Sequence, residues 1–176
     1  MLVGVVGCGG TAADPDAASA PDAASACTRT GFVAATETAE RDDELGVFFY
    51  TGLSGAGDSF DRLTVDFYFT LGAATGPHQD ELTGVDLADC STCVLMYRGC
   101  SGTTCVSATP YLAQAGTLDV TALGGVSTDF AATLTDARFA EIEIDFGTQH
   151  ATVVPDGETW CLDEQAMGAT IQGAAR

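Results

Sequence analysis

The chain has 176 residues, enough for one domain with a terminal extension. Its 25 acidic residues outnumber six basic ones, and the formal net charge is -19, so repulsion from phosphates argues against a nucleic-acid partner. A hydrophobic content of 46% is sufficient for a core, but no apolar run approaches the roughly 18 residues of a membrane-spanning helix.

The first residues contain a possible nucleotide-binding motif. Gly7, Gly9 and Ala12 follow a short apolar run with the G-x-G-x-x-A spacing of a dinucleotide-binding turn. That motif requires a helix to begin directly after it, so that the helix N-terminus holds a pyrophosphate. Pro15 and Pro21 follow instead and would break such a helix. The sequence therefore disfavours nucleotide binding.

The same residues also carry a lipoprotein signature. Val5-Val6-Gly7-Cys8 resembles the lipobox of bacterial lipoproteins, in which the cysteine is lipidated and becomes the mature N-terminus. This resemblance implies that residues 1–8 end a partial lipoprotein signal and that Cys8 is the lipidation site. No basic n-region precedes it, so we expect the true start to lie upstream. The alternative is an ordinary apolar N-terminus of a cytosolic protein.

A short repeat follows the lipobox. Residues 15–20, Pro-Asp-Ala-Ala-Ser-Ala, recur letter for letter as residues 21–26. The repeat has no large apolar side chain whose burial could offset the entropy cost of ordering it. We therefore expect residues 9–26 to be a disordered tether between an anchor and a folded domain.

From Cys27 onward, apolar and polar residues alternate. The clearest run, from Leu63 to Leu71, places apolar residues at every second position, the period of a strand with one buried face. Gly, Asp and Thr separate such runs at intervals of roughly eight to fifteen residues. The pattern predicts an all-β domain over residues 27–176, an antiparallel β-sandwich or jelly roll. The other predicted strands include residues 47–50, 118–122, 130–134, 140–146 and 152–154, with a bulge or turn near 135–137 and a last strand at 168–173.

Four of the seven cysteines lie within sixteen residues, at Cys90, Cys93, Cys100 and Cys105. Their C-x2-C-x6-C-x4-C spacing is compatible with a four-thiolate zinc site, but an exported chain meets an oxidising environment that removes thiolates. A redox C-x-x-C would need a helix directly after Cys90, whereas the following Val94 to Tyr97 favour a strand. The sequence favours structural disulfides.

With Cys8 acylated, six cysteines remain for pairing. Cys100 and Cys105 bracket a loop short enough to place two strand residues opposite each other, so we expect them to pair. Cys27 and Cys161, near the two ends of the domain, would close the longest loop. Cys90 is then left with Cys93. The alternative within the cluster is Cys90–Cys105 with Cys93–Cys100.

Candidates for other chemistry are sparse. His78 and His150 are expected to be exposed loop histidines, and Glu141 and Glu143 to lie on the solvated face of a strand. No serine occupies a G-x-S-x-G elbow. The tyrosines would form a carbohydrate platform only if Tyr50, Tyr68 and Tyr97 shared an exposed face. Loop carboxylates that could bind calcium, although without EF-hand spacing, are Asp42, Asp43, Asp58 and Asp61.

The order of lipobox, Asp/Pro/Ala tether and cysteine-containing β-domain resembles uncharacterised small lipoproteins of GC-rich Gram-negative bacteria. The resemblance implies a lipid-anchored protein of the cell envelope, in the outer membrane or at the cell surface, and otherwise a secreted or periplasmic protein. We expect a structural or binding module with a protein or carbohydrate ligand and no cofactor except a candidate calcium ion. The alternative is a secreted carbohydrate-active or other hydrolytic enzyme with dispersed carboxylates, which a cleft lined by two facing carboxylates would favour.

Overall fold

The computed structural model describes residues 27–57, 59–84, 86–102 and 104–174; the expected signal, tether and Cys8 lie outside these ranges. The described residues contain ten strands and one short 3-10 helix, η1, but no α-helix. The elements are β1 (Arg29–Thr30), β2 (Thr36–Asp42), β3 (Val47–Leu53), β4 (Phe60–Tyr68), η1 (Phe69–Leu71), β5 (His78–Glu81), β6 (Thr92–Cys100), β7 (Thr109–Leu123), β8 (Asp129–Asp145), β9 (His150–Val153) and β10 (Thr159–Gly173).

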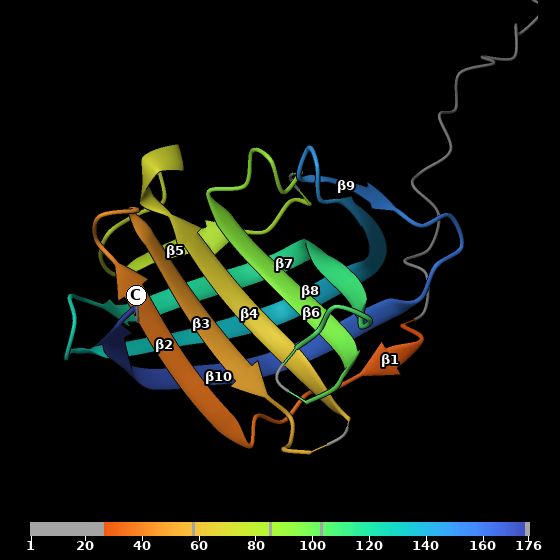
Figure 1. Ribbon diagram of the computed structural model, residues 1–176, viewed down its shortest axis with the longest axis horizontal. Helices are drawn as coiled ribbons and strands as arrows, with labels where there is room; N and C mark the ends of the chain where they lie inside the picture. Colours follow the sequence, from red (N-terminus) through yellow and green to blue (C-terminus); the bar gives the residue numbers. More distant parts are fainter. Residues whose placement is uncertain (1–26, 58, 85, 103, 175–176) are drawn as a thin grey trace, which may run out of the picture.

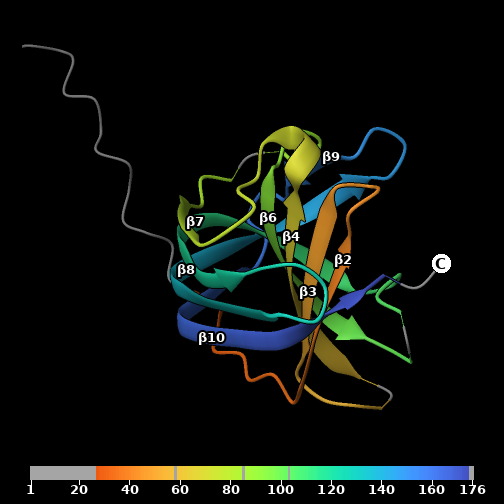
Figure 2. The ribbon, with the colours of Figure 1, turned by 90° about the vertical axis from the view of Figure 1, so that its left-hand side faces the viewer.

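The sheet closes on itself. Strands β2, β3, β4, β6, β7 and β8 are successive antiparallel neighbours. Strand β10 then pairs antiparallel with β8 and parallel with β2, which completes the ring. In Figures 1 and 2, β2, β3, β4 and β6 form one layer and β7, β8 and β10 cross behind it at a steep angle. The predicted all-β, mostly antiparallel fold is confirmed, as a sandwich whose layers are joined at both sides.

The core lies between the two layers. Leu63, Val65 and Phe67 on β4 are fully buried, as their alternation with polar residues predicts. The ring of Phe48 on β3 lies 5.4 Å from that of Phe67 and 4.9 Å from that of Phe130 on β8, so aromatic side chains connect the layers. Burying each such side chain contributes about 1.5–3 kcal/mol, which makes this face the main source of stability.

One strand is shorter than expected. The alternation that begins at Leu63 was expected to continue through Phe69 and Leu71, but β4 ends at Tyr68 and these two residues form η1. Gly72 caps this short helix, because its φ of 100° lies in the left-handed region and its backbone N–H donates to the carbonyl of Phe69. A glycine in this conformation closes a tight turn, and here that turn replaces the last part of the expected strand.

Two predicted strands join into one. The run at 130–134 and the run at 140–146, up to Asp145, are both part of β8. The irregularity expected near 135–137 is a bulge, with Asp136 at a φ of 50°. On the neighbouring strand, Gly116 has a φ of 125°, and a Cβ there would lie 2.7 Å from the Cα of Ala137. Only glycine allows the two backbones to approach this closely.

A second hydrophobic cluster lies on the outer side of the sheet. On β6, Val94 and Met96 belong to the main core, whereas the alternate residues Cys93 and Leu95 belong to the second cluster. Strand β6 is therefore covered on both faces. The outer cluster also contains Cys90, Leu112 and Ile142, with Tyr68, Leu87, Tyr97, Ile144 and Ala151 packed against it.

Candidate functional site

The six cysteines of the domain form three disulfides. The structure joins Cys27 to Cys161, Cys90 to Cys93 and Cys100 to Cys105, which are the pairs expected from the sequence. Cys27–Cys161 fastens the start of the domain to β10, next to the parallel pairing of β1 with β10. Three disulfides in a chain of this size are typical of proteins outside the cytoplasm. Within the described ranges, no helix has the length and apolar character needed to span a bilayer.

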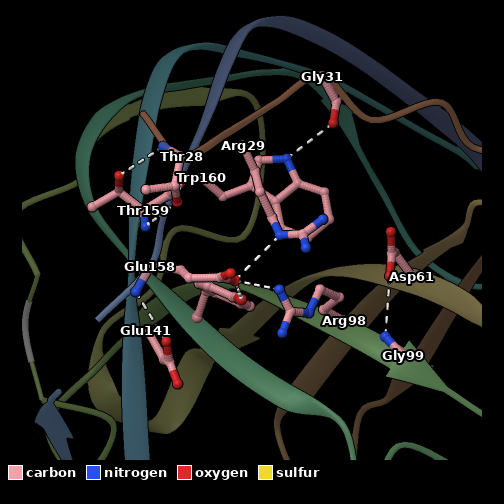
Figure 3. Close-up of polar contacts among 11 residues, drawn as sticks. Thr28, Arg29, Gly31, Asp61, Arg98, Gly99, Glu141, Glu158, Thr159 and Trp160 are labelled. Carbon is pink, nitrogen blue, oxygen red and sulfur yellow. Dashed lines mark hydrogen bonds and ion pairs between the residues drawn. The ribbon is translucent and has the colours of Figure 1, made fainter. Parts of the chain in front are cut away.

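The candidate calcium ligands are not brought together. Asp42 Oδ1 accepts the backbone N–H of Glu44 in the β2–β3 turn, and Asp43 forms an ion pair with Arg41. Asp61 lies on β4, beside the end of β3 that is remote from the β2–β3 turn, and it accepts the backbone N–H of Gly99 (Figure 3). Asp58 lies outside the described residues. Among the residues described, no group of three or more His, Cys, Asp or Glu side chains is arranged to hold a metal ion.

His78 is not the exposed loop residue that was expected. It opens β5, which pairs with β7, and its ring packs edge-on against Phe67 at 5.4 Å. Its Nδ1 lies 2.6 Å from the carbonyl oxygen of Gly76, and its Nε2 lies 3.2 Å from Asp80 Oδ2. The expectation was wrong because two carboxylates and a proline beside the histidine suggested a loop, whereas β5 lies against the core.

His150 is exposed as expected, but it has a specific partner. Its Nδ1 lies 2.6 Å from Asp86 Oδ2, and Asp86 Oδ1 accepts the backbone N–H of Ala151. The hydrogen bond to Asp86 raises the pKa of His150, and the same bond lowers the pKa of Asp86. This ion pair ties β9 to the β5–β6 loop.

The densest polar network surrounds Glu158, just before β10 (Figure 3). Its Oε2 accepts hydrogen bonds from Arg29 Nε at 3.2 Å, from the hydroxyl of Tyr111 at 2.7 Å and from the guanidinium of Arg98. Its backbone N–H donates to Glu141 Oε2 at 2.9 Å. The hydrogen bond from Tyr111, followed by that from Arg29 and by the positive charges of Arg98 and Arg29, lowers the pKa of Glu158.

This network joins four parts of the chain at one carboxylate: β1, β6, β7 and the start of β10. Trp160 extends it, because its indole N–H donates to the carbonyl of Gly31 and its ring meets Tyr111 edge-on. A carboxylate that accepts three donors and is held ionised is poorly suited to act as a general acid. The arrangement around Glu158 and Glu141 therefore fits a structural role, in which it holds these strands together, better than the role of a catalytic pair.

A cavity of about 190 Å³ lies at the outer hydrophobic cluster. Asp66 and Tyr68 come from β4, Tyr97 from β6, and Ile144 from β8. A second cavity of about 390 Å³ shares Tyr97, Ile144 and Phe146 with the first, so the two form one groove. Phe146, just beyond β8, is 85% exposed. Tyr68 and Tyr97 thus share this outer surface, whereas Tyr50 is in the core.

Asp66 is the unusual group in this cavity. It forms no hydrogen bond or ion pair with the described residues, and burial raises its pKa to about 7, although the positive charge of Arg62 acts in the opposite direction. The guanidinium of Arg62 lies instead over the ring of Tyr97, 4.5 Å from its centre. Burial, followed by the nearby Asp66 carboxyl, raises the pKa of both Tyr68, to about 12, and Tyr97. At neutral pH both tyrosines are therefore phenols, whereas Asp66 titrates in this range.

The alternation from Leu63 to Leu71 predicts one buried face and therefore implies that Asp66, between two buried residues, lies on the solvated face. The available signal was on the next strand. Residues 93–97, Cys-Val-Leu-Met-Tyr, are apolar at consecutive positions, which indicates a strand covered on both faces. An aspartate that pairs with such a strand, as Asp66 does with Cys93, is consequently covered as well.

Comparisons with known proteins found no protein-family model, curated protein or solved structure that matches this chain.

Proposed function

We propose that this chain is an envelope-anchored binding module that holds a small ligand in the cavity at Asp66. The three disulfides support a location outside the cytoplasm. The lipobox-like Val5-Val6-Gly7-Cys8 supports attachment through a lipid at Cys8, with residues 9–26 as the tether. The folded domain would then present its groove to the periplasm or to the cell exterior.

The observation that carries the proposal is the unpaired carboxyl group of Asp66 in an apolar and aromatic cavity. Removing a carboxylate from water without a partner is costly, and this cost is usually retained where a ligand supplies the partner. The other lining side chains, such as Tyr68, Tyr97 and Ile144, provide the apolar contact area that a small ligand requires.

Binding suits this cavity better than hydrolysis. A glycosidase needs two carboxyl groups facing each other across the substrate. Among the described residues, Asp66 is the one carboxyl group that lines the first cavity, and the carboxyl group of the second part of the groove, Glu143, belongs to an exposed residue and is not among the residues that line the cavity at Asp66. The closest arrangement elsewhere, Glu141 beside Glu158, has three donors on the Glu158 carboxylate and lines neither part of the groove.

Ligand-detected NMR on the purified domain tests the binding site. A library of sugars, amines, organic acids and short alcohols should give hits whose signals weaken with Phe146→Ala, because that side chain lines both parts of the groove. The matched control is Val33→Ala, which truncates a side chain that is also exposed, at 79%, and lies outside the groove. Hits that respond equally to both substitutions, or no hits at millimolar concentration, would refute a site at this groove.

Fractionation of cells tests the anchor separately. Cys8→Ser should move the protein from the membrane fraction to the soluble fraction, because the thiol that receives the lipid is absent. A Cys8→Ser protein that stays in the membrane fraction, or a native protein found only in cytosol, contradicts lipid attachment at this residue.

A further inference from the structure

We infer that the groove binds a small organic cation, an alkylammonium ion, whose charge is neutralised by Asp66 and whose carbon atoms contact the surrounding rings. This inference rests on the proposed binding function and specifies its ligand. It follows from three features of the cavity: the state of its carboxyl group, the chemistry of its walls, and the charge of the whole domain.

The first feature is a carboxyl group that no cationic side chain contacts directly. Asp66 forms no ion pair with the described residues. The cation that influences it, Arg62, is engaged over the ring of Tyr97. A ligand cation would provide the charge that the surrounding side chains do not, and in a partly desolvated site such a charge-assisted hydrogen bond is strong.

The second feature is the wall of the cavity. Tyr68, Tyr97 and Phe146 place three aromatic rings around one space, and the ring of Phe49 supports Tyr68 edge-on at 6.3 Å. Aromatic faces attract ammonium groups, and rings grouped around a carboxylate are a common way to recognise them. Ile144 adds an aliphatic surface that an alkyl chain would cover.

These walls do not suit a metal ion. Calcium takes six to eight oxygen ligands, whereas the cavity lining supplies one carboxyl group, two phenols and the amide of Gln149. An anion would meet no cationic lining residue and would approach a chain of net charge -19. The same net charge favours the approach of a cation.

The proton and the ligand should compete for Asp66. Of the residues that line the cavity, only Asp66, Tyr68 and Tyr97 titrate, and both tyrosines do so above the physiological range. Because the pKa of Asp66 is about 7, its ionised fraction rises about tenfold between pH 6 and pH 8. The affinity for a cation should rise by the same factor.

Titration of the domain with n-butylammonium, followed by calorimetry and by amide NMR shifts, tests this inference. The dissociation constant should fall about tenfold from pH 6 to pH 8, with shifts centred on β4 and β6. Asp66→Asn should weaken binding at least tenfold at pH 8 and abolish the pH trend. The control is Asp163→Asn, which removes the same charge from an exposed position. It should leave the affinity at pH 8 and the pH trend unchanged. A pH trend that persists in Asp66→Asn would come from another group, such as the exposed His150–Asp86 pair, and would contradict Asp66 as the titrating group.

The neutral probes 1-pentanol and glucose separate the possible failures. Pentanol that binds in the groove as tightly as butylammonium, with no pH dependence, would overturn the cation inference and leave a binding site for apolar ligands. Glucose that binds there in preference to butylammonium would overturn it in favour of a carbohydrate. If none of the three probes shifts the amides of the groove, both the inference and the proposed function fail.

Discussion

Removal of the Cys27–Cys161 disulfide should cost far more stability than removal of Cys100–Cys105. In the chain-entropy description, a cross-link stabilises the fold by restricting the unfolded chain, and the effect grows with the logarithm of the loop length. The two cysteines are 134 residues apart in the first pair and five in the second. These separations correspond to about 5 and about 2 kcal/mol, a difference of about 3 kcal/mol.

The test is equilibrium unfolding in urea of the two double variants, Cys27→Ala with Cys161→Ala and Cys100→Ala with Cys105→Ala. The comparison is conservative, because Cys100 is buried and its replacement also removes packing, whereas Cys27 and Cys161 are half-buried. The long-loop variant should nevertheless be the less stable of the two. If the two variants lose equal stability, or the short-loop variant loses more, restriction of the unfolded chain is not the main effect of these bonds.

Two further predictions concern single positions. The pKa of His150 should lie above its ordinary value of 6.5, so the ion pair with Asp86 supports the fold below that value, as long as Asp86 is ionised, and is lost as the pH rises through the raised pKa. NMR titration of the imidazole measures this shift, and Asp86→Asn should bring the pKa back toward 6.5; a native pKa of 6.5 or lower contradicts the interaction. Gly116→Ala should lower the free energy of unfolding by about 3 kcal/mol, since its methyl group would meet the backbone of Ala137 at a strained φ. Gly55→Ala, which adds a methyl group in open space, is the control and should change stability by under about 1 kcal/mol, so equal urea midpoints would refute this account.

The sequence predicts the β4 strand and its buried face well, because regular alternation from Leu63 to Phe67 reports a single core. It predicts β10 poorly. Trp160 and Leu162 are buried at even positions, but Met167 and Ile171 are buried at odd ones, so the alternation changes phase within the strand. Sequence analysis consequently indicated only its last part, residues 168–173.

The candidate site was less predictable than the fold, since it depends on contacts between distant segments. Asp66 differs from a solvated strand residue only because Tyr97 and Ile144, remote in sequence, cover its side of the sheet. The cysteines were the exception. Their spacing restricts the pairings, and the short interval between Cys100 and Cys105 leaves few alternatives.

The bond between Cys27 and Cys161 also determines how the domain carries mechanical load. A pulling force on the chain ahead of Cys27 passes through the disulfide into β10, which is paired on both sides, with β8 and with β2. It does not detach the two-residue strand β1. The 134-residue interval between the two cysteines is enclosed in a covalent loop and adds nothing to the extension when the chain is stretched between its ends. In a force experiment the oxidised domain would lengthen only by the segment beyond Cys161, whereas reduction would release the whole interval.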